Sequence, residues 1–146
     1  MFFGATPTLQ KIALPSNLTL LGKNALKEIA SLTEVIMPDT LKTIKDSSFF
    51  KCAALPQLVF PENITKIEAS AFSGCYALQT FDFRKAKAVP TLENTSAFAN
   101  TPTTKEIVVP DELYEDWIAA NNWNSSTNSI VSTIVKASES SLGVLA

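Results

Sequence analysis

A repeat of 23 residues runs through most of this chain and limits the folds that it can adopt. The clearest marker is one leucine per copy, found at Leu9, Leu32, Leu55 and Leu78. A proline follows six residues later in three of these copies, at Pro15, Pro38 and Pro61. A unit of this length cannot bury its own apolar face, so the copies must stack to build a core. The period therefore predicts an array of stacked coils.

Other apolar positions recur in step with the leucine. They are Ile12, Val35, Leu58 and Phe81; Leu14, Met37, Phe60 and Phe83; Leu18, Leu41 and Ile64; Leu21, Ile44 and Ile67; and a closing bulky residue at Phe3, Leu26, Phe49, Phe72 and Phe98. Each copy has a short segment, such as residues 11–14, whose alternation predicts a strand with one buried face. The proline after it cannot donate a ladder hydrogen bond, so it marks a turn. Stacking thus predicts a parallel sheet.

The fourth copy departs from this pattern. Arg84 replaces the proline, and three extra residues precede Phe98, so we expect Val89 and Leu92 to take the positions of Leu18 and Leu21. A fifth segment, residues 104–110, resumes the register, because TKEIVVP aligns with LQKIALP.

The pattern L-x-x-I-x-L-P-x-x-L-x-x-I-x-x-x-A-F-x-x-C, clearest from Leu55 to Cys75, resembles the BspA-like (Treponema-type) leucine-rich repeat of bacterial surface proteins. The likeness covers about residues 2–110, and the following VVPDELYEDWIAANNW resembles the terminal cap of such arrays, to roughly Ile134. It implies an α/β repeat: a right-handed solenoid with a short-stranded parallel sheet and a C-terminal helical cap. The chain would be the C-terminal portion of such a protein.

We expect three parts: a repeat array over residues 1–110 whose first unit is truncated, a cap over 111–137, and a frayed tail or linker over 138–146. In the cap, Asp111 can cap a helix that has Leu113, Trp117 and Ile118 on one face, and Trp123 can fold back on the last coil. The apolar stretch 130–135 should pack alongside. The truncated first unit fits either a fragment of a longer protein or a gene whose upstream coils lie elsewhere.

Residues that flank the inward positions should point outward from the sheet in two columns. The polar column is Lys11, Glu34, Gln57, Thr80 and Glu106, and the mostly apolar column is Ala13, Ile36, Val59, Asp82 and Val108. These ten residues are the candidate ligand-binding face, because an exposed row of Ile36, Val59 and Val108 is typical of a contact site. The alternative is that β-branched residues simply favour strands.

Several function classes are excluded by composition. There is no histidine, only four glycines and no metal-ligand spacing, so we expect no enzyme activity, cofactor or metal. The net charge of −2 gives no electrostatic attraction for nucleic acid. No apolar run is long enough to cross a membrane. Cys52 and Cys75 share one repeat position, so a disulfide is conceivable, but two inert buried thiols are the favoured interpretation.

The resemblance implies a non-catalytic binding module, on the cell surface or secreted, that recognises a protein or glycan and serves adhesion to host matrix or other cells. The alternative is a passive spacer or an end-piece of a longer array. A third hypothesis is self-association through the first coil around Phe2 and Phe3.

Overall fold

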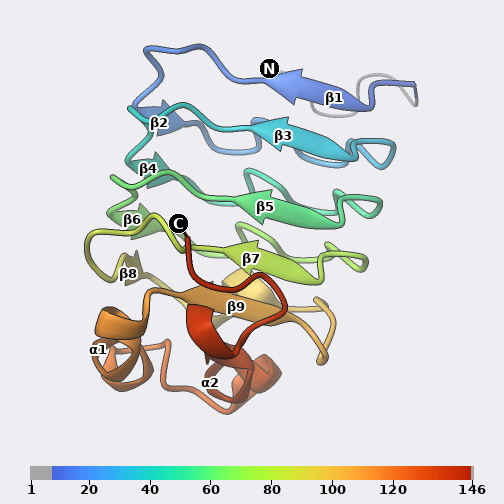
Figure 1. Cartoon of the computed structure of the whole chain (residues 1–146). Helices are drawn as coiled ribbons and strands as arrows, with labels where there is room; N and C mark the ends of the chain where they lie inside the picture. Colours follow the sequence, from blue (N-terminus) through green and yellow to red (C-terminus); the bar gives the residue numbers. More distant parts are fainter. Residues whose placement is uncertain (1–7, 146) are drawn as a thin grey trace.

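A computed structural model describes residues 8–145 as coils stacked in chain order, with two rows of short parallel strands (Figure 1). The first row contains β1 (Lys11–Ala13), β3 (Glu34–Ile36), β5 (Gln57–Val59), β7 (Thr80–Asp82), β9 (Glu106–Val109) and β10 (Ile134–Lys136). The second row contains β2 (Leu20–Leu21), β4 (Thr43–Ile44), β6 (Lys66–Ile67) and β8 (Thr91–Leu92). The predicted parallel stacking of the repeats is confirmed.

The register of both rows follows the repeat. Gln57 pairs with Thr80, one 23-residue unit later along the chain. Thr80 then pairs with Glu106, so this step has three more residues and absorbs the insertion of the fourth copy. In the second row Leu92 pairs with Ile67, which confirms the position expected for Leu92.

Aromatic side chains fill the core in the later coils. The ring of Phe72, which is fully buried, has its centroid 5.7 Å from that of Phe60 and 5.2 Å from that of Phe81. Ring contacts continue from Phe72 to Phe98 at 5.6 Å, and from Phe98 to Trp123 at 5.6 Å. Such pairs each add about 0.5–1.5 kcal/mol beyond the burial of their area. The core is thus one continuous cluster that joins the repeats to the cap.

The first row is interrupted between β3 and β5, which are not hydrogen-bonded to each other. In the neighbouring coils the residue before the strand bonds to the coil before it. Thr33 N–H donates to the Gln10 carbonyl at 2.8 Å, and Gln79 N–H donates to the Pro56 carbonyl at 3.0 Å. Pro56 holds this position in the third coil and has no N–H to donate. The row therefore splits at Pro56, whereas the second row pairs continuously from β2 to β8.

Left-handed backbone closes the turn of each coil. Equivalent turn positions hold Glu28 (φ 62°), Lys51 (φ 57°) and Gly74 (φ 77°). Glycine alone adopts this conformation without a steric penalty. At Gly74 an added Cβ would also lie 2.8 Å from Cγ of Lys51.

We expect Gly74→Ala to lower the free energy of unfolding by about 1–2 kcal/mol, because alanine pays the left-handed penalty at this position. Gly22→Ala is the matched control, since nothing lies within 4 Å of a Cβ built there. That control should be neutral or slightly stabilising. Urea unfolding of both variants measures the difference, and equal midpoints would contradict the prediction.

A compact cap follows the last coil. It contains α1 (Tyr114–Ala119), α2 (Ile130–Thr133) and 3-10 helices at Asp111–Leu113, Thr127–Ser129 and Ala137–Glu139; another 3-10 helix, Thr95–Phe98, lies in the fourth coil. Trp117 is buried, and Leu113 and Ile118 pack against the core, which confirms their predicted common face. Trp123 folds back as expected, and its Nε1 donates to the Pro90 carbonyl at 2.8 Å.

The cap and the tail differ from the expectation in three ways. Asp111 does not cap α1, because its carboxylate accepts from the Ser138 N–H at 3.0 Å and α1 has no side-chain cap. The apolar stretch 130–135 does pack alongside, but its end enters β10, which pairs with β9 and extends the first row. The residues after β10 are held by hydrogen bonds described below, so the expectation of a frayed tail was wrong.

Candidate functional site

The structure aligns the predicted sheet-face residues in the two expected columns, with Lys11 opposite Glu34 and Ala13 opposite Ile36. Six of the ten are exposed: Lys11, Ala13, Glu34, Ile36, Gln57 and Val59. The other four lie further along the stack, where Thr80 and Glu106 are half-buried and Asp82 and Val108 are buried. The open part of the face therefore belongs to β1, β3 and β5.

Val108 was expected in the exposed row, and this was wrong, because its side chain is fully buried. After β10 the chain turns back and passes in front of β9 toward β7 (Figure 1). We call residues 137–145 the C-terminal strap. The Ser141 hydroxyl donates to the carboxylate of Glu106 at 2.7 Å, so the strap lies across the same face of β9 as Val108.

Asp82 was also expected to be exposed and is instead 6% exposed, because Arg84 covers it. Arg84 Nε and Nη2 donate to the two carboxylate oxygens at 3.0 and 2.9 Å, in a bidentate pair. The hydrogen bonds with Asp82 raise the pKa of Arg84. The remaining Nη1 donates to the carbonyls of Leu142 at 3.3 Å and Gly143 at 3.1 Å. The residue that replaces the repeat proline therefore holds the strap.

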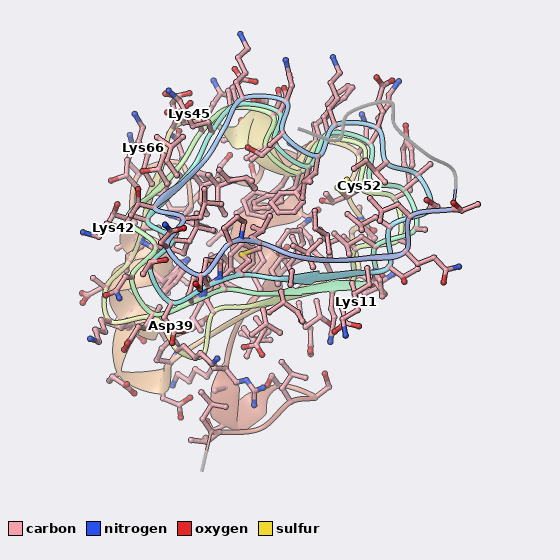
Figure 2. All side chains as sticks on the ribbon, turned by 90° about the horizontal axis from the view of Figure 1, so that it is seen from above. Lys11, Asp39, Lys42, Lys45, Cys52 and Lys66 are labelled. Atoms are coloured by element: carbon pink, nitrogen blue, oxygen red, sulfur yellow. The ribbon has the colours of Figure 1, made fainter. Side chains whose placement is uncertain are left out.

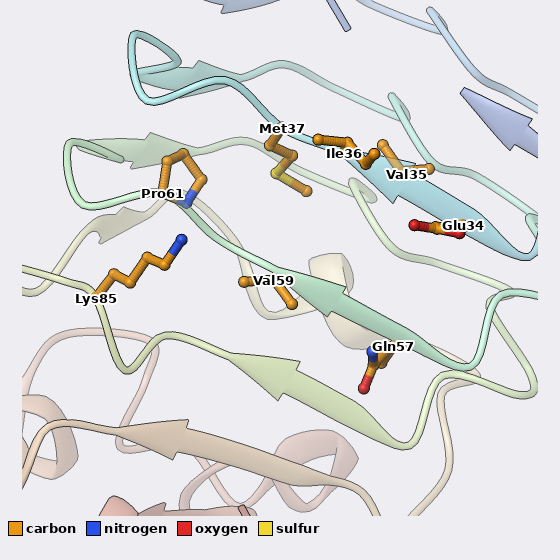
Figure 3. A pocket seen from close by; sticks show the side chains of 8 residues that line it. All are labelled: Glu34, Val35, Ile36, Met37, Gln57, Val59, Pro61 and Lys85. Carbon is orange, nitrogen blue, oxygen red and sulfur yellow. The ribbon is translucent and has the colours of Figure 1, made fainter. Parts of the chain in front are cut away.

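A groove lies on the open part of the face, at the interruption between β3 and β5 (Figure 3). Its volume is about 190 Å³. It is lined by Glu34, Val35, Ile36, Met37, Gln57, Val59, Pro61 and Lys85. Ile36 and Val59 are 44% and 38% exposed, which is high for large apolar side chains. The groove thus has an apolar centre between polar ends.

Lys85 reaches the groove from the inserted loop of the fourth copy. Figure 3 shows its amine directed toward Pro61 and Val59. The loop is tied back to the third coil by Lys87, whose N–H donates to the Glu62 carbonyl at 3.4 Å and whose Nζ lies 3.1 Å from the Glu62 carboxylate. Lys85 was not among the residues predicted for the binding face; the insertion next to a missing proline was the signal that could have indicated it.

The basic side chains do not all belong to this face. Viewed along the stack, Lys42, Lys45 and Lys66 lie on a different side of the coils from Lys11 (Figure 2). Lys66 is neutralised by ion pairs with Glu68 at 3.7 Å and Glu93 at 3.8 Å. Of the side chains that line the groove, only Lys85, from the insertion loop, is basic.

The two cysteines are free and buried, in agreement with the favoured interpretation. The thiol of Cys52 donates to the Leu26 carbonyl at 3.1 Å, and that of Cys75 to the Phe49 carbonyl at 3.1 Å. Burial raises the pKa of Cys52 to about 12 and that of Cys75 further. Since the thiolate is the reactive form, neither thiol is poised as a nucleophile or metal ligand.

Lys105 is a buried cation that links the last repeat to the cap. It is 2% exposed, and its Nζ donates to the carbonyls of Pro102 at 3.2 Å and Asn128 at 2.9 Å. No carboxylate within residues 8–145 forms an ion pair with it. Burial therefore lowers the pKa of Lys105 from 10.5 to about 8.

This pKa makes stability depend on pH in a defined direction. Between about pH 8 and pH 10.5 the unfolded chain holds the Lys105 proton and the folded chain does not, so the free energy of unfolding should rise with pH, by about 3 kcal/mol in total. Lys105→Met removes this titration but leaves the other lysines. Chemical unfolding across this range should show a steeper rise for the unmodified protein, and parallel curves would refute the prediction.

Within residues 8–145 no three cysteine or acidic side chains gather where they could hold a metal ion. None of the helices described there has the length and apolar character needed to cross a membrane. The cap carboxylates Glu112, Glu115 and Asp116 are exposed on the surface.

The family model for the BspA type leucine rich repeat region matches residues 1–131 of this chain, in six copies. The chain belongs to this family. The BspA-type match includes all the repeats and most of the cap, but it ends before β10 and the strap. No curated protein matches the chain at a significant level.

Solved structures of bacterial leucine-rich repeat proteins share the BspA-type fold seen here. The Treponema pallidum leucine rich repeat protein is 25% identical, with a TM-score of 0.62 over 75% of this chain and 48% of its own. A Bacteroides ovatus leucine-rich repeat protein is 21% identical, with a TM-score of 0.65 over 88% of this chain and 30% of its own. A leucine rich cell surface protein from Faecalibacterium prausnitzii is 26% identical, with a TM-score of 0.53 over 70% and 30%.

This BspA-type chain therefore spans half or less of the length of the structures that it resembles. The comparisons give it the fold of a leucine-rich repeat array with short parallel strands and few helices. They name no ligand for any of these proteins.

Proposed function

We propose that this chain is a non-catalytic recognition module that binds a protein or glycan through the open part of its sheet face. The observation that carries the proposal is the groove between β3 and β5, where Ile36 and Val59 are exposed side by side. A localised apolar patch on a repeat surface is typical of a contact site. The competing hypothesis is a passive spacer, for which we would expect an evenly polar face.

We further propose that the module acts at the cell surface or after secretion, in adhesion to host matrix or to other cells. The BspA-type family supports a surface location, as does the similarity to a cell surface protein of Faecalibacterium prausnitzii. Self-association through Phe2 and Phe3 stays a separate hypothesis, because both residues lie outside the described part of the chain.

The test is binding of the purified module to an array of extracellular-matrix proteins and glycans. Ile36→Glu/Val59→Glu should abolish a saturable signal, because two carboxylates would have to be desolvated at the contact. The matched control is Leu20→Glu/Tyr76→Glu, which changes two exposed apolar residues outside the groove, 43% and 59% exposed.

Circular dichroism must show that both double variants are folded. Loss of binding in the groove variant alone would support the proposal. Equal loss in both variants would place recognition elsewhere, and absence of any saturable signal would favour the spacer.

A further inference from the structure

We infer that the groove takes one apolar side chain of an extended peptide that carries a basic residue on one side of this anchor and an acidic residue on the other. The inference rests on the proposed function, because it names the partner class of the same face. Its support comes from the size of the groove, the charges at its ends and the way the strap occupies the same sheet.

The volume of the groove favours a single side chain over a whole small molecule. Pockets that bury drug-sized ligands usually measure about 300–1,000 Å³, whereas this groove measures about 190 Å³. Its apolar centre is formed by Ile36, Met37 and Val59. An aliphatic or aromatic side chain fits both the size and the chemistry.

Opposite charges mark the two ends. Lys85 is exposed and forms no ion pair with any residue of the 8–145 segment, so its charge is available to an acidic partner. At the other end Glu34 contacts Lys11 at 3.7 Å, and both side chains are more than half exposed. An exposed pair of this kind is weak, so a basic residue of a ligand can compete for Glu34.

The lining of the groove runs along the strands, from Glu34 and Gln57 at one end to Pro61 and Lys85 at the other (Figure 3). A peptide that follows the groove would therefore lie parallel or antiparallel to the strands. In an extended chain alternate side chains point to one side and each residue advances about 3.3 Å. The complementary pattern is therefore basic, any, apolar, any, acidic, with the acidic residue beside Lys85.

The C-terminal strap shows that this sheet accepts polypeptide on its outer face. Across β7 and β9 the carbonyls of Leu142 and Gly143 accept from Arg84, and the hydroxyl of Ser141 donates to Glu106. The strap leaves β3 and β5 open, and these strands hold the groove. A ligand peptide would use the same kind of surface on the unoccupied coils.

The test uses the whole chain, labelled with 15N, and the synthetic peptide acetyl-Ser-Lys-Ser-Leu-Ser-Asp-Ser-amide. We expect saturable NMR shifts confined to amides of residues 34–37, 57–60 and 84–87. Lys85→Glu should weaken binding about three- to fivefold, as for an exposed charge pair. A peptide with Lys in place of its Asp should show the reverse preference and bind the Lys85→Glu protein more tightly than the unmodified one.

Lys42→Glu is the matched control, because it makes the same charge change at an exposed lysine that does not line the groove, and it should leave the affinity unchanged. Shifts outside the groove, no shifts, or equal effects of Lys85→Glu and Lys42→Glu would overturn the inference. Failure of the peptide inference can be told apart from failure of the proposed function. If the peptide does not bind but Ile36→Glu/Val59→Glu still abolishes binding to the matrix and glycan array, the inference fails and the proposed function stands.

Discussion

Phe72→Ala is expected to lower the free energy of unfolding by about 3–5 kcal/mol, which is a large part of the total stability of an ordinary domain. Phe72 is fully buried and contacts the rings of Phe49, Phe60, Phe81 and Phe98. Alanine would leave a cavity where four aromatic neighbours meet, and stacked coils cannot close it without losing their register. Few other single positions join so many repeats.

Urea or guanidinium unfolding followed by circular dichroism measures this change. Tyr76→Ala is the matched control, since Tyr76 lies four residues away in the same coil and is 59% exposed. Its effect should stay within about 0.5 kcal/mol. A loss below about 1 kcal/mol for Phe72→Ala would mean that the core is less tightly packed than described here.

The second large effect is expected at Trp123, in the contact between the cap and the repeats. Trp123→Phe should cost about 1–3 kcal/mol more than Trp117→Phe. Both indoles are buried and their ring centroids lie 5.4 Å apart, so the two substitutions remove the same atoms from neighbouring sites. Only Trp123 gives up a hydrogen bond, from Nε1 to the Pro90 carbonyl. Nε1 of Trp117 has no partner among the described residues.

Equilibrium unfolding of the two variants, measured side by side, gives this difference directly. Each substitution serves as the volume control for the other. Equal losses would show that the Pro90 carbonyl finds another donor, and a larger loss for Trp117→Phe would indicate that its indole N–H is hydrogen-bonded in solution.

The repeat could be predicted from the sequence because each coil has the same kinds of residues at the same positions. Leucine and phenylalanine at fixed intervals determine which side chains meet, so the pairing of Ile44 with Ile67, one 23-residue unit apart, follows from counting alone. The two outward columns follow from the alternation of the strands, since a shift of one residue would bury Glu34 and expose Val35. Local periodicity is sufficient to predict the packing wherever a coil contacts only its neighbouring coils.

The covered half of the sheet face could not be predicted in this way. The strap is rich in serine and has no apolar period, so its sequence resembles a solvated tail. Its position depends on Arg84, which lies 58 residues before Leu142. Contacts over such distances depend on where the whole stack brings the chain, and a single sequence carries no repeated signal for them.

The proline that interrupts the first row also has a mechanical consequence. Around Pro56 successive coils are joined by paired strands on one side only, since β4 and β6 remain hydrogen-bonded while β3 and β5 do not. The two coils can therefore rotate about the paired strands of the second row, while the unpaired edge between β3 and β5 opens or closes. Bending of the array should concentrate there, so the width of the groove is the dimension that changes most easily. A bound peptide would hold β3 and β5 at a fixed separation and would stiffen the coils on either side of the groove.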